Sequence, residues 1–174
     1  TPEKSPITSW AYSILGQIYV VLPLALLGVW GYKSDYQLFM NTEYLLMALF
    51  VFVWTNDTGA YIVGCTLGKH RLFERISPKK SWEGFFGGLA FCIILASLAN
   101  YIIPGMLSTA QWIGMGILTS ISSTWGDLCE SLLKRTAGVK DSGKILPGHG
   151  GILDRFDSEL IASPVIFIYL TFVL

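Results

Sequence analysis

The sequence predicts an all-α fold, a polytopic bundle of transmembrane helices. Only 14% of its 174 residues are charged, against about 25% in an average soluble domain, and 52% are hydrophobic. Two stretches, 5–32 and 84–126, contain no Asp, Glu, Lys or Arg. Because a bilayer needs about 20 mostly apolar residues per helix, the first stretch holds one span and the second holds two. The net charge is zero, so charge does not suggest a nucleic-acid polymer as a partner.

Five spans are expected, in a single membrane-embedded domain that covers residues 1–174. The first uncharged stretch predicts a span at 10–31, and the apolar segment before the first basic loop predicts one at 44–67. The second uncharged stretch predicts spans at 82–103 and 111–135, joined by a turn near Pro104 and Gly105. The last span, 160–174, has 15 uncharged residues, which is short, so the chain is expected to be part of a longer protein.

Basic residues predict the orientation of these spans. The loop 68–81 carries five of them and the segment 134–159 another five, whereas the two opposite loops hold only Lys33. Positive charge marks the cytoplasmic loops of membrane proteins. The loops 68–81 and 136–159 are therefore expected on the cytoplasmic side, and they share a side only if all five spans are present. The prediction is a multi-pass protein of the inner (cytoplasmic) membrane.

Asp57 is the only charge within the second span. A carboxylate in a span is costly, and by default it faces a polar cavity or a partner. The alternative is that the sequence NDTG interrupts the helix and that Asp57 caps the helix after it. Both interpretations can hold together.

The fourth span ends in TWGDLCESLLKR, where four polar residues are spaced at i, i+3, i+4 and i+7: Asp127, Glu130, Ser131 and Lys134. This spacing puts them on one face of a helix. The alternative to a functional role is a structural ladder of carboxylates and lysine in water. Asp127 follows 43 uncharged residues and is expected near membrane depth, which favours function.

The first basic loop contains ERISPKKSWEG. Ser77 and Pro78 can be a helix N-cap followed by proline at the first helical position. Ser81 can start the third span. Lys79 and Lys80 either anchor a membrane helix or bind phosphate.

The segment LPGHGGILDRFDS, residues 146–158, gathers charge among glycines. Gly148, Gly150 and Gly151 let backbone N–H groups approach a ligand closely and adopt positive φ, and such loops can form anion-binding nests. His149 fits a hydrogen-bonded loop histidine as well as it fits a phosphate contact. The alternative for the two aspartates is a capping box, with Asp154 as N-cap of the last helix and Asp157 at its third position.

Several carboxylates and many cations facing one membrane surface suggest a divalent metal and a phosphorylated substrate. Mg²⁺ takes oxygen ligands, often one or two carboxylates together with substrate phosphates. The three cysteines are isolated and form no CxxC pair, which argues against a zinc site. No G-x-x-x-x-G-K-[ST] sequence is present, so the chain is not a P-loop enzyme.

From Ser131 the chain reads SLLKRTAGVKDSGKILPGHGGILDRFD. This segment closely resembles the signature of the phosphatidate cytidylyltransferase (CDP-diglyceride synthase) family, and the chain is identified as a bacterial member. NDTGAYIVG, SPKKSWEG and GDLCESLLKR also resemble family segments. The resemblance extends from Val53 to Asp157. The matching signature positions are Ser131, Lys134, Arg135, Lys140, Asp141, Pro147, His149, Gly150, Gly151, Asp154, Arg155 and Asp157.

The resemblance implies an enzyme of phospholipid biosynthesis, in which CTP and phosphatidate give CDP-diacylglycerol and pyrophosphate at a site facing the cytoplasm. It implies Mg²⁺, with Asp127 on the emerging helix and Asp154 on the loop after the glycines as first-choice ligands and Asp157, Asp141 and Glu130 as second choices. The other expected catalytic residues are Lys134, Arg135, Lys140, His149 and Arg155. The expected substrate-binding residues are Asp57, Lys79, Lys80, Ser131, Lys144, Gly150 and Gly151.

The implied partners are CTP, phosphatidate and membrane lipid. A second, monovalent cation such as K⁺ and a homodimer are left open. One rival is another membrane enzyme that uses CTP on a lipid, such as a polyprenol or phytol kinase or an archaeal CDP-lipid synthase. The other is a cation transporter without enzymatic activity, with Asp57 and Asp127 in its pathway. Ten of the twelve basic residues lie in the two basic segments, which argues against a transporter.

Overall fold

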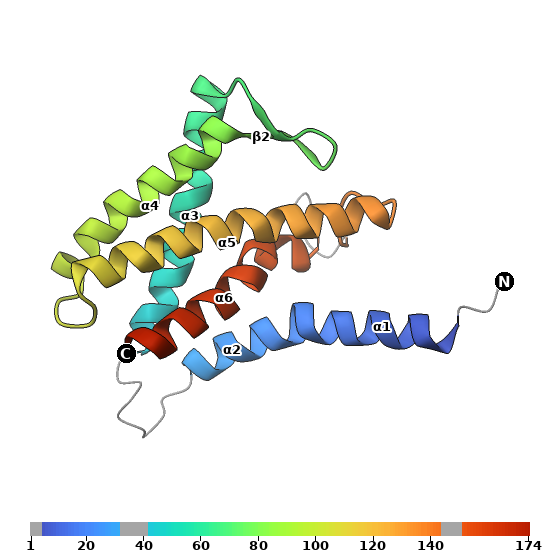
Figure 1. Cartoon of the computed structure of the whole chain (residues 1–174), viewed down its shortest axis with the longest axis horizontal. Coiled ribbons are helices and arrows are strands. Elements are labelled where there is room, and N and C mark those ends of the chain that lie inside the picture. Colours follow the sequence, from blue (N-terminus) through green and yellow to red (C-terminus); the bar gives the residue numbers. More distant parts are fainter. Residues whose placement is uncertain (1–4, 32–41, 144–150) are drawn as a thin grey trace.

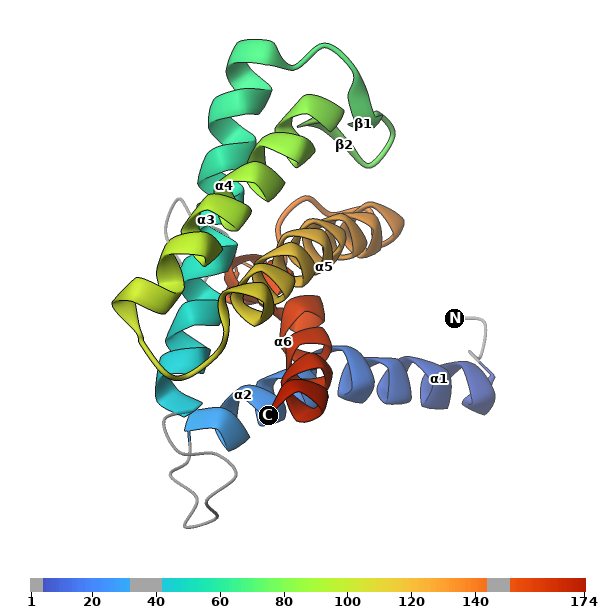
Figure 2. The ribbon, with the colours of Figure 1, turned by 60° about the vertical axis from the view of Figure 1, so that its left-hand side comes forward.

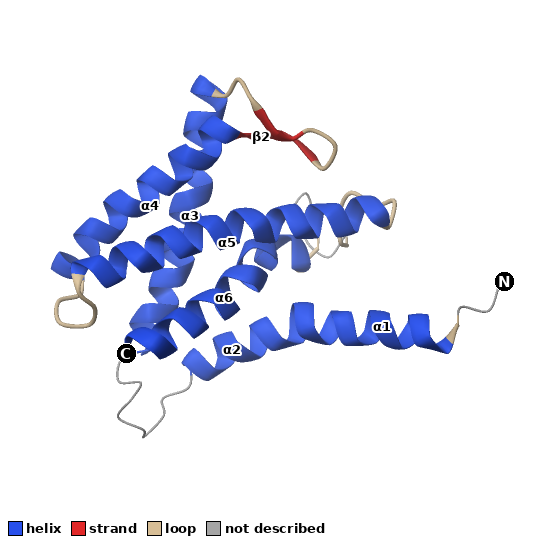
Figure 3. Ribbon diagram, viewed as in Figure 1, coloured by secondary structure: helices blue, strands red, loops and turns tan. Residues whose placement is uncertain are grey.

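The computed structural model describes residues 5–31, 42–143 and 151–174, and within them the fold is the predicted bundle of helices (Figures 1 and 3). The elements in chain order are α1 (Pro6–Gly16), a π-helical turn η1 (Gln17–Val21), α2 (Leu22–Gly31), α3 (Thr42–Leu67), β1 (Arg71–Phe73), β2 (Ser77–Ser81), α4 (Trp82–Ile102), α5 (Thr109–Thr136) and α6 (Leu153–Val173).

Four helical segments of the described chain are long and apolar enough to cross a membrane: Pro6–Trp30, Glu43–Leu67, Trp82–Ile102 and Leu153–Val173. They overlap four of the five predicted spans. The fifth, 111–135, corresponds to α5, whose buried side includes the hydroxyl residues Thr119, Ser120, Ser122, Ser123 and Thr124. The passage of α5 through the bilayer stays a prediction.

The N-terminal helical segment touches the bundle with only part of its length. No residue of α1 is buried, and Ile7 and Trp10 are 81% and 72% exposed, as expected of side chains that face lipid. Helix α2 packs against α6, where the rings of Trp30 and Phe167 stack 5.7 Å apart between centroids. Figure 1 shows α1 continuing away from the other helices beyond this contact.

The core of the bundle lies between α3, α4, α5 and α6. Helix α3 packs along α4, and α5 packs against both α4 and α6 (Figure 2). Phe52 of α3 lies 6.4 Å from Trp112 of α5 between ring centroids, with both side chains buried. Cys92 of α4 and Ile166 of α6 are fully buried in the same cluster. This core holds α3, α4, α5 and α6 together beside the polar residues described below.

Helix α3 runs without a break through NDTG, so the predicted interruption before a cap at Asp57 is wrong. The tertiary structure explains this continuity, because Asn56 uses its side chain across the bundle. Its amide donates to Ser123 Oγ (3.1 Å), and its carbonyl oxygen accepts from Ser120 Oγ (2.6 Å), both on α5. An asparagine held in this way stabilises the helix that carries it.

The first basic loop forms an antiparallel hairpin of β1 and β2, which the sequence analysis did not predict. The expected N-cap at Ser77 is wrong, because Ser77 and Pro78 lie in β2. The start of the third span at Ser81 is confirmed, since the Ser81 hydroxyl accepts from Gly84 N at 3.1 Å. The hairpin reaches toward α5, where Phe73 lies 6.0 Å from Trp125 between ring centroids.

Helix α6 begins at Leu153, seven residues before the predicted start of the last span at 160. The sequence DRFDSE is therefore helical, and Asp154 lies in the first turn of α6 rather than on a loop. The predicted capping box is wrong: the N-cap is Ile152, and it makes no side-chain cap. The first two turns of α6 carry charged residues, so an uncharged stretch marks only the part of the helix that follows them.

Candidate active site

An ion pair joins the hairpin to α5. Lys80 Nζ lies 2.5 Å from Asp127 Oδ2, and the two side chains are 25% and 34% exposed. The pair lines a cavity of about 260 Å³, here called the hairpin-side cavity. Asp57 and Lys79 line the same cavity. Four residues predicted to form the site, from three separate segments of the chain, thus face one space.

A second space of about 310 Å³, the α6-side cavity, lies against the start of α6. Asp57 and Asp127 line both cavities. In the α6-side cavity they are joined by Asp154, Arg155, Asp157, Ser158 and Glu159. The structure therefore brings Asp57, Asp127 and the DRFD segment together, as the sequence analysis expected.

The residues on the predicted polar face of α5 form two separate groups of contacts, one around Asp127 and one around Lys134. Ser131 Oγ donates to Asp127 Oδ1 at 3.2 Å. Lys134 pairs with the buried Glu130 and, at 2.7 Å, with Asp154 Oδ1. Glu130 and Lys134 do pair along the helix, but Glu130 is 1% exposed, so the contact is not a ladder in water; Asp127 turns instead to Lys80 and to the cavities.

The carboxylate of Asp154 is held by the protein itself. Its Oδ2 accepts from Ser142 N (2.9 Å), Ser142 Oγ (2.8 Å) and Gly151 N (2.7 Å), in addition to the contact of Oδ1 with Lys134. These bonds tie the start of α6 to the segment after α5. The side chain is only 11% exposed.

Two glycines permit close approach of the backbone at this point. A Cβ on Gly126 would lie 2.6 Å from Asp157 O, so α5 and α6 meet tightly beside Asp127. A Cβ on Gly151 would clash with Ser142 Oγ and would lie 2.8 Å from Gly143 N. Among the described glycines positive φ occurs only at Gly105 and Gly138, so the expected positive φ at Gly151 is wrong. The atoms that approach Gly151 closely are the Ser142 side chain and the backbone of Ser142 and Gly143.

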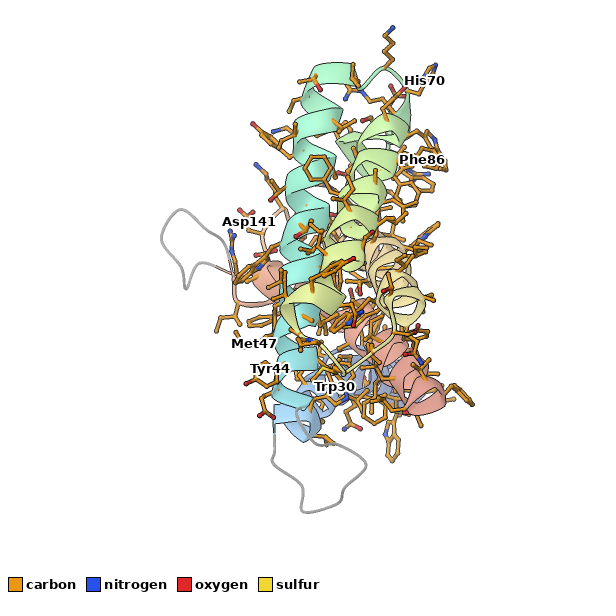
Figure 4. The ribbon with its side chains drawn as sticks, turned by 90° about the vertical axis from the view of Figure 1, so that its left-hand side faces the viewer. Trp30, Tyr44, Met47, His70, Phe86 and Asp141 are labelled. Carbon is orange, nitrogen blue, oxygen red and sulfur yellow. The ribbon has the colours of Figure 1, made fainter. Side chains whose placement is uncertain are left out.

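The other predicted residues are more scattered. Arg135, Lys140 and Asp141 are exposed and line neither cavity. Arg135 instead faces a separate groove between the hairpin and α5. Figure 4 shows Asp141 at the margin of the bundle, and His70 near the hairpin. Lys144, Pro147, His149 and Gly150 lie outside the described residues.

The oxygen donors of the site bear on whether it can hold a hard metal ion. Within residues 5–31, 42–143 and 151–174, no group of three or more His, Cys, Asp or Glu side chains is arranged to hold a metal ion. Mg²⁺ needs fewer, because one or two carboxylates suffice when substrate phosphates complete its shell. Asp127 and Asp157 line the α6-side cavity and offer such oxygens. The residues present therefore fit a Mg²⁺ ion that is shared with a phosphorylated ligand.

Glu159 was missed by the sequence analysis. It lines the α6-side cavity, is 4% exposed, and its Oε2 has no hydrogen-bond partner among the described residues. In the sequence, Glu159 stands two residues after Asp157 and directly before the uncharged stretch 160–174. Because the sequence predicts that the last helix starts at 160, Glu159 falls in the predicted loop before it.

The fold and these cavities define a multi-pass membrane protein with a charge-lined site inside its helical bundle. Comparison with known proteins narrows this class. The chain belongs to the cytidylyltransferase family, whose model matches residues 1–173.

Among its relatives are proteins named phosphatidate cytidylyltransferase. The chain is 41% identical over 160 residues to that of Staphylococcus aureus (strain COL) and 40% identical over 159 residues to that of Staphylococcus haemolyticus (strain JCSC1435). Each match covers 91% of this chain and 61% of the relative. The chain thus spans about three fifths of the length of these curated relatives.

Proposed function

We propose that the protein is a phosphatidate cytidylyltransferase, which converts CTP and phosphatidate into CDP-diacylglycerol and pyrophosphate at the cytoplasmic face of the membrane. The observation that carries the proposal is the meeting of two cavities, each lined by charged residues, at Asp57 and Asp127 inside a bundle of apolar helices. Such a site can receive a water-soluble nucleotide and a membrane lipid together. Membership of the family and the names of the relatives agree with it.

The reaction needs positioning more than it needs a protein nucleophile. A phosphate oxygen of phosphatidate attacks the α-phosphorus of CTP, a new oxygen–phosphorus bond forms, and the bond to the leaving pyrophosphate breaks. The phosphate monoester is already largely ionised at pH 7, so a strong general base is not required. Catalysis of this kind rests on orientation and on neutralising charge.

The cations of the site would hold the phosphates. Lys80 and Lys79 line the hairpin-side cavity, and Arg155 lines the α6-side cavity. The ion pair of Lys80 with Asp127 places a cation of the hairpin-side cavity beside a carboxylate that also lines the α6-side cavity. Lys134 is held between Glu130 and Asp154, which supports a role in fixing the start of α6.

Mg²⁺ when bound would offset the negative charge of the triphosphate and of the leaving pyrophosphate. Asp127 and Asp157 are the proposed ligands. Asp154, the first choice beside Asp127 on sequence grounds, already accepts bonds from Lys134, Ser142 and Gly151. This arrangement supports Asp154 as the residue that positions Asp157 one turn further along α6.

The test is incorporation of radiolabelled CTP into lipid by the purified full-length protein in mixed micelles. Phosphatidate and a polyprenol are offered separately as acceptors, with Mg²⁺ present and after its removal by chelation. We expect labelled lipid with phosphatidate only, and a loss of incorporation after chelation. Transfer to the polyprenol instead would identify a different lipid enzyme, and absence of transfer to either acceptor would refute the proposal.

A further inference from the structure

Glu159 is a buried carboxylate that none of the roles above uses. It lies in the second turn of α6 and is 4% exposed, yet it lines the α6-side cavity with Asp57, Asp127 and Asp157. Its Oε2 is enclosed and has no hydrogen-bond partner among the described residues. A buried acceptor of this kind is costly unless a ligand supplies a donor.

The chemistry of the two substrates restricts what that donor can be. An ionised carboxylate only accepts hydrogen bonds. The phosphate and ester groups of phosphatidate are acceptors or anions, and the triphosphate of CTP is an anion. The ribose hydroxyls and the 4-amino group of cytosine are the donors that these two molecules carry. Carboxylates bind both kinds of group in proteins, the ribose hydroxyl in dinucleotide sites and the amino group of cytosine in base recognition.

We infer that Glu159 binds the nucleoside part of CTP, accepting a hydrogen bond from a ribose hydroxyl or from the cytosine amino group. The inference rests on the proposed function, because it takes CTP as the nucleotide. It places the nucleoside in the α6-side cavity. The triphosphate then extends past Asp127 toward Lys80 in the hairpin-side cavity, since Asp127 lines both spaces.

Specificity follows from the same contact. Uridine presents a carbonyl oxygen where cytidine presents the amino group, so a carboxylate would repel UTP if it contacts the base. If the carboxylate contacts the ribose, the hydrogen bond that is lost on substitution is the one from a ribose hydroxyl. The informative analogue is then dCTP, which lacks the 2′-hydroxyl. The amide of a glutamine keeps the size of Glu159 but weakens the bond to a donor, and its NH₂ group can donate to a carbonyl oxygen.

The experiment compares Glu159→Gln with wild type in the full-length protein. We measure kcat/KM for CTP, dCTP and UTP, binding of radiolabelled CTP without lipid, and thermal stability. Glu43→Gln is the matched control, because Glu43 lies in the first turn of α3 and lines neither cavity. We expect Glu159→Gln to lower kcat/KM for CTP about tenfold (about 1.4 kcal/mol), chiefly through KM, with weaker CTP binding and little change in melting temperature.

The nucleotide analogues identify the contact. A rise in the UTP/CTP ratio identifies the base, and a reduced difference between CTP and dCTP identifies the ribose. Unchanged CTP binding and kinetics in Glu159→Gln would overturn the inference, and so would an effect confined to the Mg²⁺ concentration that the enzyme requires, which would make Glu159 a cation ligand. If the wild type binds CTP but transfers no cytidylyl group to phosphatidate, the proposed function fails while the binding comparison still tests Glu159.

Discussion

Lys80 on the hairpin and Asp127 on α5 meet at 2.5 Å, although 46 residues separate them in the chain. The contact brings a cation from the first basic loop to the carboxylate shared by both cavities. Because both side chains remain partly exposed, the pair contributes little to stability, of the order of 1 kcal/mol or less. Its value to the protein lies in placing opposite charges where two polyanionic substrates and a metal ion would meet.

The first prediction concerns Asp127. Asp127→Asn keeps the shape of the side chain but removes the negative charge that a Mg²⁺ ion requires. We expect cytidylyl transfer to fall roughly 100-fold or more, since even residues behind metal ligands cost 10–100-fold when changed. The melting temperature in detergent should change little, as the side chain is 34% exposed. Glu74→Gln, at the exposed hairpin, is the control, and activity within a few-fold of wild type for Asp127→Asn would remove Asp127 from the metal site.

Asp154 should behave differently from Asp127. Asp154→Asn weakens the bonds from Lys134, Ser142 and Gly151 together. We expect a loss of about 2 kcal/mol in stability, typical of hydrogen bonds to a charged group, alongside the loss of activity. Two measurements, thermal unfolding and the transfer assay, distinguish Asp154→Asn from Asp127→Asn. Full stability with abolished turnover in Asp154→Asn would restore it as a direct metal ligand.

Gly151 is predicted to matter for packing. The Cβ of Gly151→Ala would clash with Ser142 Oγ and with Gly143 N, so the start of α6 should loosen and the melting temperature should fall with activity. Gly28→Ala is the control, because no atom lies within 4 Å of its added Cβ. A change in CTP kinetics without a change in melting temperature would instead indicate that the GHGG segment binds phosphate.

The orientation in the membrane is predicted from charge. Lys79 and Lys140 should both lie on the cytoplasmic face. Each is replaced by cysteine in a variant without Cys65, Cys92 and Cys129, and labelled with a membrane-impermeant thiol reagent in intact cells and in inverted vesicles. We expect labelling in the vesicles only. Labelling of both sites in intact cells would reverse the orientation, and labelling of the two sites from opposite sides would refute the five-span topology.

The sequence by itself determined the helical bundle and much of the site. Long uncharged stretches place helices because the cost of burying charge in lipid is large and local. The i, i+3, i+4 and i+7 spacing put Asp127 and Lys134 on one face of α5 because helix geometry alone sets it. The Ser81 cap could be read for the same reason, since a cap depends on neighbours along the chain.

Only the tertiary structure decided which charges are partners. Asp127 and Asp154 look alike in the sequence, yet one pairs with Lys80 and faces two cavities, and the other is held by Lys134, Ser142 and Gly151. The start of α6 at Leu153 could also be seen only in the folded chain, as could the Glu159 Oε2 that lacks a hydrogen-bond partner among the described residues. Hydropathy and spacing report the preference of a residue for its surroundings. The group that pairs with a buried charge comes from a distant segment of the chain, and the packing of the helices determines which group that is.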